Sequence, residues 1–299
     1  MTGPNPRRAY ALLMGVILFW GLNWPIMKIG LQYIPPFAFG AARMLLGAAL
    51  VVLLLAVRKE LRLPGKQDVP VVLSVGILQL AVVVSCNNLG LEQVGAGRAA
   101  LLAYTTPLWV APGAVLFLGE RLSPLKLVGM SIGLLGLAVL FNPLGFAWDQ
   151  PRVLRGNALL LLGALAWAIC ILHVRGHRWQ RSPLQLLPFQ MLVAAPPMLG
   201  LSLLLERDQP IVWALPLAAV LAYNAAVATA FCFWAAITVQ RLLPATTTSL
   251  GMLGVPCVGI LASVLFLDEP LTVSLVGGLV GIVGGLALVL RADSGARAT

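Results

Sequence analysis

Long apolar runs recur along the whole chain, and they constrain its fold more than any other feature. Each run has about 20 residues, the length that a helix needs to cross the hydrocarbon core of a bilayer. Ten such runs fit into the 299 residues. Lipid admits only helices or closed barrels, and the runs are too long and too evenly apolar for barrel strands. We therefore expect an all-α membrane protein with ten transmembrane helices.

The expected spans are joined by short connections, so the chain has no room for a separate soluble domain. Only 10% of its residues are charged, against about 25% in an average soluble domain. The ten expected spans are residues 9–29, 37–57, 70–89, 99–118, 122–141, 156–174, 184–205, 215–239, 245–267 and 271–290.

The basic residues predict the orientation of the chain in the membrane. The net charge is +10, but Lys and Arg are scattered over short connections instead of forming the basic surface of a nucleic-acid-binding protein. With a cytoplasmic N-terminus, fourteen of the twenty Lys and Arg residues lie on the cytoplasmic side, five on the other side, and Arg43 inside a span. This bias predicts a multi-pass membrane protein with both termini cytoplasmic.

An internal repeat divides the chain into two halves, 1–148 and 149–299. At an offset of 149, residues 107–140 match residues 256–289 at 11 of 34 positions, and Glu120 falls on Glu269. At an offset of 147, Trp20 falls on Trp167 and Arg43 on Gln190. Because each half holds five spans, an odd number, the two five-helix repeats are expected to be inverted relative to each other. Inverted repeats are typical of secondary transporters that work by alternating access.

The repeated segment also carries a family resemblance. Residues 107–123 contain Leu-Phe-Leu-Gly-Glu-Arg-Leu-Ser, and residues 256–272 contain Leu-Phe-Leu-Asp-Glu-Pro-Leu-Thr. This pair resembles the two EamA repeats of the drug/metabolite transporter superfamily, and the whole chain looks most like the YddG-type aromatic amino acid exporters. The resemblance implies a ten-helix inner-membrane exporter with a central cavity between the repeats.

Polar and aromatic residues near the expected midplane are the candidates for a substrate site. Amide and hydroxyl groups can bind an ammonium and a carboxylate, while indole and phenol rings contact an apolar body. Each residue alone also fits a helix–helix contact, and only the clustering points to a site. The candidates are Trp20, Asn23, Trp24, Arg43, Gln79, Tyr104, Thr105, Trp109, Trp167, Gln190 and Tyr223, within a wider polar set that includes Asn87 and Asn88.

An arginine, three prolines and several glycines within the expected spans carry further expectations. Arg43 could bind a substrate carboxylate, or it could extend to the outer membrane interface or cap helix carbonyls. Pro25, Pro107 and Pro256 are expected to act as gating hinges, since proline kinks helices. Glycines at four-residue spacing, including Gly129 and Gly285, predict a close approach of two helices.

These features favour export of amino acids, aromatic and other neutral ones, across the inner membrane. The alternative is export of other small metabolites or drugs. A membrane-embedded enzyme is least favoured, since all ten acidic residues are expected outside the spans and both histidines lie near one helix end. No cofactor, metal or nucleic acid is expected. The expected partners are amino acids and membrane lipids, and the expected state is a monomer or a weak oligomer.

Overall fold

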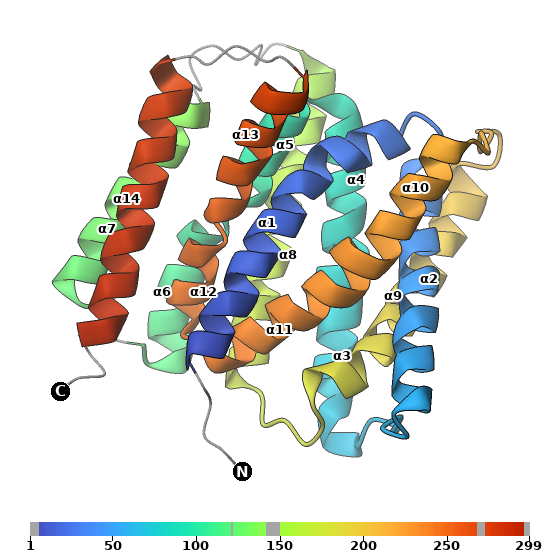
Figure 1. The fold of residues 1–299 in the computed structure, drawn as a ribbon, viewed down its shortest axis with the longest axis horizontal. Helices are drawn as coiled ribbons and strands as arrows, with labels where there is room; N and C mark the ends of the chain where they lie inside the picture. The colour runs from blue at the N-terminus through green and yellow to red at the C-terminus, as the bar shows by residue number, and fades with distance from the viewer. Residues whose placement is uncertain (1–5, 121, 142–149, 268–272, 296–299) are drawn as a thin grey trace.

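The computed structural model describes residues 6–120, 122–141, 150–267 and 273–295, which form helices and connections without a strand. Figure 1 shows the helices packed as one bundle. In the first half they are α1 (Pro6–Gly30), α2 (Pro36–Val57), η1 (Lys66–Asp68), α3 (Val69–Ser74), η2 (Val75–Val82), α4 (Val83–Gln93), α5 (Ala96–Ala103), α6 (Thr106–Leu118) and α7 (Pro124–Phe141). In the second half they are α8 (Pro151–Gly176), α9 (Pro183–Leu205), α10 (Leu215–Tyr223), η4 (Asn224–Phe231), α11 (Cys232–Leu242), α12 (Ala245–Gly251), α13 (Gly254–Leu267) and α14 (Val273–Gly295).

Seven helical segments of the described chain are long and apolar enough to cross a membrane. They are Arg7–Gly30, Pro36–Val57, Lys66–Gln93, Ala99–Leu118, Pro151–Gly176, Pro183–Leu205 and Leu215–Leu242. Two shorter apolar helices, Pro124–Val139 and Val276–Val289, lie where the fifth and tenth spans are expected. The ninth expected span contains α12 and α13 in succession. The all-α membrane fold is thus confirmed.

The third and eighth expected spans share an unusual local structure. Each contains a π-helical turn, η2 at 75–82 and η4 at 224–231, and both ends differ by 149 residues. The following helices, α4 and α11, begin and end at the same offset. π turns are rare and concentrate at functional sites. The repeat found in the sequence therefore extends to details of the backbone.

The fourth and ninth expected spans are each broken in the middle. α5 ends before Tyr104 and Thr105, and Pro107 lies in the first turn of α6. In the second half, Met252 and Leu253 separate α12 from α13, and Pro256 lies in the first turn of α13. A proline is tolerated there because the first turn of a helix has free N–H groups. α1, by contrast, continues through Pro25.

Glycines bring α7 and α14 into backbone contact, as their spacing predicts. A methyl group added at Gly129 would lie 2.8 Å from the carbonyl oxygen of Gly285, and one added at Gly136 would lie 2.7 Å from that of Gly278. Since 129 and 278 are equivalent positions, as are 136 and 285, the two contacts are reciprocal. Their order shows that α7 and α14 run in opposite directions, side by side at one flank of the bundle (Figure 1).

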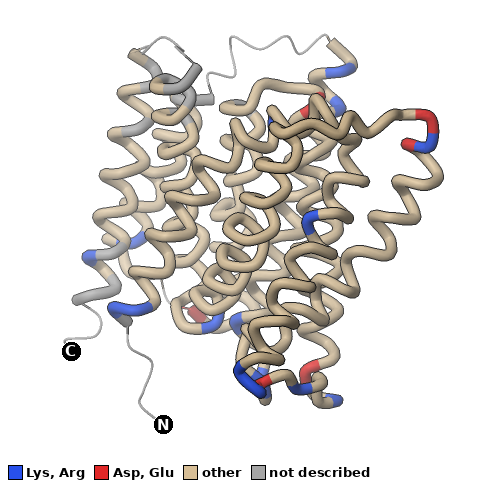
Figure 2. Tube along the Cα trace, turned by 45° about the vertical axis from the view of Figure 1, so that its right-hand side comes forward, with Lys and Arg blue, Asp and Glu red and all other residues tan. Residues whose placement is uncertain are grey.

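Charged residues gather at the two ends of the bundle, and the described part of the chain shows more Lys and Arg at the end where α1 begins and α14 finishes (Figure 2). The acidic residues are expected outside the spans, and Glu92 and Asp293 lie in helices that extend past the expected spans 70–89 and 271–290. Both lie in the last turn of a helix, because α4 and α14 continue past their apolar segments.

Two glutamates connect the halves by accepting hydrogen bonds from the first residues of helices. The Glu120 carboxylate accepts bonds from the Ala245 N–H at 2.6 Å and the Thr246 hydroxyl at 2.8 Å, where α12 begins. The Glu206 carboxylate accepts bonds from the N–H groups of Phe37 and Ala38, at 2.7 and 2.9 Å, where α2 begins. A negative charge is favoured at this end of a helix dipole.

Candidate functional site

A cavity of about 50 Å³ lies inside the bundle, between α1, α2, η2, α4, α8 and α11. Ligand-filled pockets measure roughly 300–1,000 Å³. A metabolite would therefore need helices or side chains to move apart before it could enter. The described residues that line the cavity are Trp20, Asn23, Trp24, Met27, Arg43, Gln79, Val83, Val84, Asn87, Asn88, Tyr104, Trp167 and Phe233.

The cavity brings together seven of the eleven candidate residues: Trp20, Asn23, Trp24, Arg43, Gln79, Tyr104 and Trp167. The other four lie elsewhere. The Thr105 hydroxyl donates to the carbonyl of Leu102 at 2.8 Å, and the Tyr223 hydroxyl donates to that of Phe19 at 2.8 Å. The side chain of Trp109 is 40% exposed, and Gln190 is fully buried within α9.

Arg43 is the cation of this site. The side chain is 3% exposed, so it does not extend to the membrane interface. Its Nε donates to the Thr229 hydroxyl at 2.9 Å, and one terminal nitrogen lies 3.5 Å from the Met27 sulfur. Within the described ranges, Arg43 forms no ion pair. A buried guanidinium with free donors favours an anion, and carboxylates match its planar geometry.

Four aromatic rings form one wall of the cavity. The rings of Trp20 and Trp167 meet edge to face with centroids 5.7 Å apart, and Tyr104 meets Trp167 in the same way at 5.3 Å. Trp24 lies 6.4 Å from Tyr104 and extends the wall. Since Trp20 and Trp167 are equivalent positions of the repeat, the two halves meet at this pair. Such rings offer an apolar surface and attract cations to their faces.

Amide groups that line the cavity have unmet hydrogen-bonding capacity. The side-chain oxygens of Asn23, Asn87 and Asn88 are buried without a protein partner, as is the Gln79 side-chain nitrogen. The Trp167 indole N–H also lacks one. Buried polar groups are nearly always satisfied, so these atoms require water or a ligand. The cavity therefore offers a cation, further donors and several acceptors to one small molecule.

Sequence reasoning found the polar members of the site better than the apolar ones. Asn87 and Asn88 belong to the wider polar set, and their spacing of four from Val83 and Val84 places all four on one helix face. Met27, Val83, Val84 and Phe233 were not predicted. Nothing in the sequence separates them from the many apolar residues that pack between helices.

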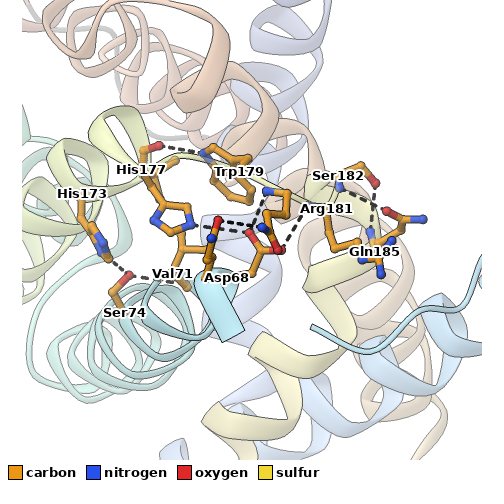
Figure 3. Close-up of polar contacts among 12 residues, drawn as sticks. Asp68, Val71, Ser74, His173, His177, Trp179, Arg181, Ser182 and Gln185 are labelled. Carbon is orange, nitrogen blue, oxygen red and sulfur yellow. Dashed lines mark hydrogen bonds and ion pairs between the residues drawn. The ribbon is translucent and has the colours of Figure 1, made fainter. Parts of the chain in front are cut away.

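A second polar cluster lies outside the cavity and also connects the two halves (Figure 3). The buried Asp68 carboxylate accepts hydrogen bonds from the N–H groups of Gln180 and Arg181, at 3.0 and 3.1 Å. The His177 ring lies 3.6 Å from the same carboxylate, and His173 shares a 2.7 Å hydrogen bond with Ser74. The described residues contain no group of three His, Cys, Asp or Glu that could hold a metal ion. The geometry indicates a connection between helices.

The bundle with its buried polar cavity defines the class of protein as a membrane transporter, and comparison with known proteins gives the family. Residues 7–142 and again 154–291 match the EamA-like transporter family. The chain therefore belongs to this family, and it contains two EamA repeats, called the first and second repeat below. The predicted family is thus confirmed.

Individual relatives cover nearly the whole chain. The uncharacterized transporter YvbV of Bacillus subtilis is 28% identical over 95% of this chain and 92% of its own. A probable amino-acid metabolite efflux pump of Salmonella typhimurium is 29% identical over 94% of each chain. A solved structure with 22% identity covers 96% of this chain and 99% of its own with a TM-score of 0.75, which supports the fold.

Proposed function

We propose that this protein is a secondary transporter that exports amino acids, aromatic and other neutral ones, across the bacterial inner membrane. Its ten spans form two inverted five-helix repeats that alternate access to the central cavity, with both termini cytoplasmic. The relative from Salmonella typhimurium, named a probable amino-acid metabolite efflux pump, supports this substrate class.

The buried Arg43 without an acidic partner is the observation that carries the proposal. It binds the substrate carboxylate, because a charge-assisted hydrogen bond in a water-poor cavity is strong. The substrate ammonium is a donor and matches the free amide oxygens of Asn23 and Asn87. The rings of Trp20 and Tyr104 then contact the substrate side chain.

The helix directions support the inverted arrangement. α7 and α14 are equivalent in the two repeats and run antiparallel. The breaks at Tyr104 and Met252 lie at nearly equivalent places, and discontinuous helices are common in transporter repeats. We propose that Pro107 and Pro256, next to these breaks, are the hinges of gating, with Pro25 as a third in α1.

Reconstituted transport tests the site. Purified protein in liposomes should catalyse counterflow of labelled amino acids, and Trp20→Ala or Tyr104→Ala should reduce it. Trp109→Ala is the matched control, because this tryptophan lies outside the cavity. Undiminished counterflow in both cavity variants would overturn the site. A panel of substrates, with and without a pH gradient, separates amino acids from the alternative of other metabolites or drugs.

Topology mapping tests the repeat arrangement separately. Single cysteines at Glu120 and Glu269 should be labelled from opposite sides of the membrane, in a chain whose native cysteines are replaced. Labelling of both positions from the same side would contradict the inverted repeats and remove the case for alternating access.

A further inference from the structure

A groove on the outside of the bundle is not part of the transport site. It has a volume of about 710 Å³ and shares no lining residue with the central cavity. It lies between α2, α9, η4 and α11, with the first turn of α1 at its end. The described lining residues are Arg8, Val51, Leu54, Arg58, Ser182, Pro183, Leu184, Ala226, Ala230, Phe231, Trp234, Thr238 and Leu242.

The groove is apolar along its length and cationic at one end. Leu54, Phe231 and Trp234 belong to its wall, which follows α11 and η4 from residue 242 to residue 226. The sixteen steps from residue 226 to residue 242 rise by at most about 24 Å, against the roughly 15 Å of one bilayer leaflet. The groove is therefore long enough to hold much of one extended acyl chain.

The cationic end contains two exposed arginines, Arg8 and Arg58. In the part of the chain that the structure describes, neither forms an ion pair. Ser182, the N-cap of α9, lies in the same lining, and its capping box with Gln185 already engages the N–H groups of both residues. The two guanidinium groups therefore supply the attraction for a phosphate, which matches their planar donor geometry.

We propose that this groove binds one anionic phospholipid, with the phosphate at Arg8 and Arg58 and one acyl chain along Phe231 and Trp234. The positive charge at the end of the groove favours an anionic phospholipid over other occupants. A second copy of the chain would bring the same basic end, and the like charges would repel. A neutral phospholipid would gain less from the two arginines, since each basic residue near an anionic membrane contributes about 1 kcal/mol.

Binding to the purified full-length chain tests the proposal. Native mass spectrometry in detergent should show one tightly bound phosphatidylglycerol, and phosphatidylcholine with the same acyl chains should bind at least tenfold more weakly. Arg8→Gln with Arg58→Gln should weaken phosphatidylglycerol binding by about 10- to 30-fold, from two contributions of about 1 kcal/mol each. The matched control is Arg62→Gln with Lys66→Gln, which removes the same charge outside the groove.

A second pair of variants tests the acyl-chain wall. Ala226→Trp places an indole in the groove and should displace the lipid, whereas Ala222→Trp, at an exposed position outside the groove, should not. Glycerol phosphate should fail to compete at lipid concentrations, because it lacks the chains. Equal binding of the two lipids would overturn the proposal. Equal losses in the arginine variant and its charge control, or full competition by glycerol phosphate, would overturn it too.

Discussion

The two repeats share a backbone plan, but their contributions to the cavity differ. Of the thirteen described residues that line it, eleven belong to the first repeat, and Trp167 and Phe233 belong to the second. Where the first repeat has Asn23, Arg43 and Gln79, the equivalent positions of the second hold Cys170, Gln190 and Ala228. Asn87 and Asn88 correspond to Ala236 and Ile237.

A transporter needs a backbone that can move and side chains that bind its substrate, and the two repeats differ in the second of these. The repeated features are the π turns, the broken helices and the glycine contact, and they belong to the backbone. The features that occur once are polar side chains. If the proposed function holds, the scaffold that moves is duplicated, whereas the polar side chains that would recognise the substrate lie almost entirely in one copy. The following variants test this division.

Arg43→Gln should have the largest effect, because it gives the first repeat the residue that the second repeat has at this position. A hydrogen bond to a charged group contributes about 1.5–3 kcal/mol, so transport of amino acids should fall about 10- to 150-fold. Initial rates of counterflow in liposomes measure it. Gln190→Arg added to this variant should not restore transport, since Gln190 does not line the cavity. Recovery would show that the repeats are chemically interchangeable.

Gly285→Ala should break the shared scaffold and leave recognition intact. The new methyl group would lie 2.5 Å from the carbonyl oxygen of Gly129, so the helices must separate, at a cost of about 1–3 kcal/mol. Thermal unfolding in detergent should show a lower Tm with unchanged KM for transport. Gly284→Ala is the matched control, because a methyl group there meets nothing within 4 Å. Equal Tm values for the two variants would contradict the contact.

Asn23→Ala should produce a smaller loss of transport, in the repeat that carries recognition. Asn87 offers the substrate ammonium a second amide oxygen, so the loss should be partial, about 0.5–1.5 kcal/mol, which corresponds to a two- to tenfold increase in KM. Substrate-concentration series in liposomes measure it. Gln190→Ala is the control, because it removes a buried amide of the second repeat that does not line the cavity, and it should leave KM unchanged. An increase in KM for Gln190→Ala alone would place recognition in the second repeat.

Glu120→Gln should have the smallest effect, because it weakens one connection between the repeats while the amide oxygen keeps one of the two acceptor positions. Loss of the negative charge at the start of α12 should cost about 0.3–1 kcal/mol. The Tm in detergent measures it. The exposed Glu60 provides the control, and Glu60→Gln should leave the Tm unchanged.

The sequence predicts the site best where a helix is continuous. Trp20, Asn23 and Trp24 share one face of α1 at spacings of three and four, and all three line the cavity. α6 begins only after the break at Tyr104 and Thr105, so positions before and after it do not share one helical register. Tyr104 faces the cavity, whereas Trp109, five residues further on, faces outward.

For the other residues, the packing of the helices determines whether the side chain lines the cavity. Whether Arg43 or Gln190 faces the cavity depends on how α2 and α9 pack, and the two helices have similar sequences around these residues. Met27 and Phe233 are ordinary apolar residues until the packing is known. The breaks themselves follow from Pro107 and Pro256, which the sequence does mark, but the π turns contain no residue that predicts them.

The reciprocal glycine contact between α7 and α14 has the geometry of an interface between two identical molecules related by a two-fold axis. Two separate five-helix chains inserted in opposite orientations could associate in the same way. Such a homodimer would have to present every guanidinium twice. In one fused polypeptide the two halves can differ, so Arg43 occurs once, and the proposed site would distinguish the carboxylate end of an amino acid from its ammonium end.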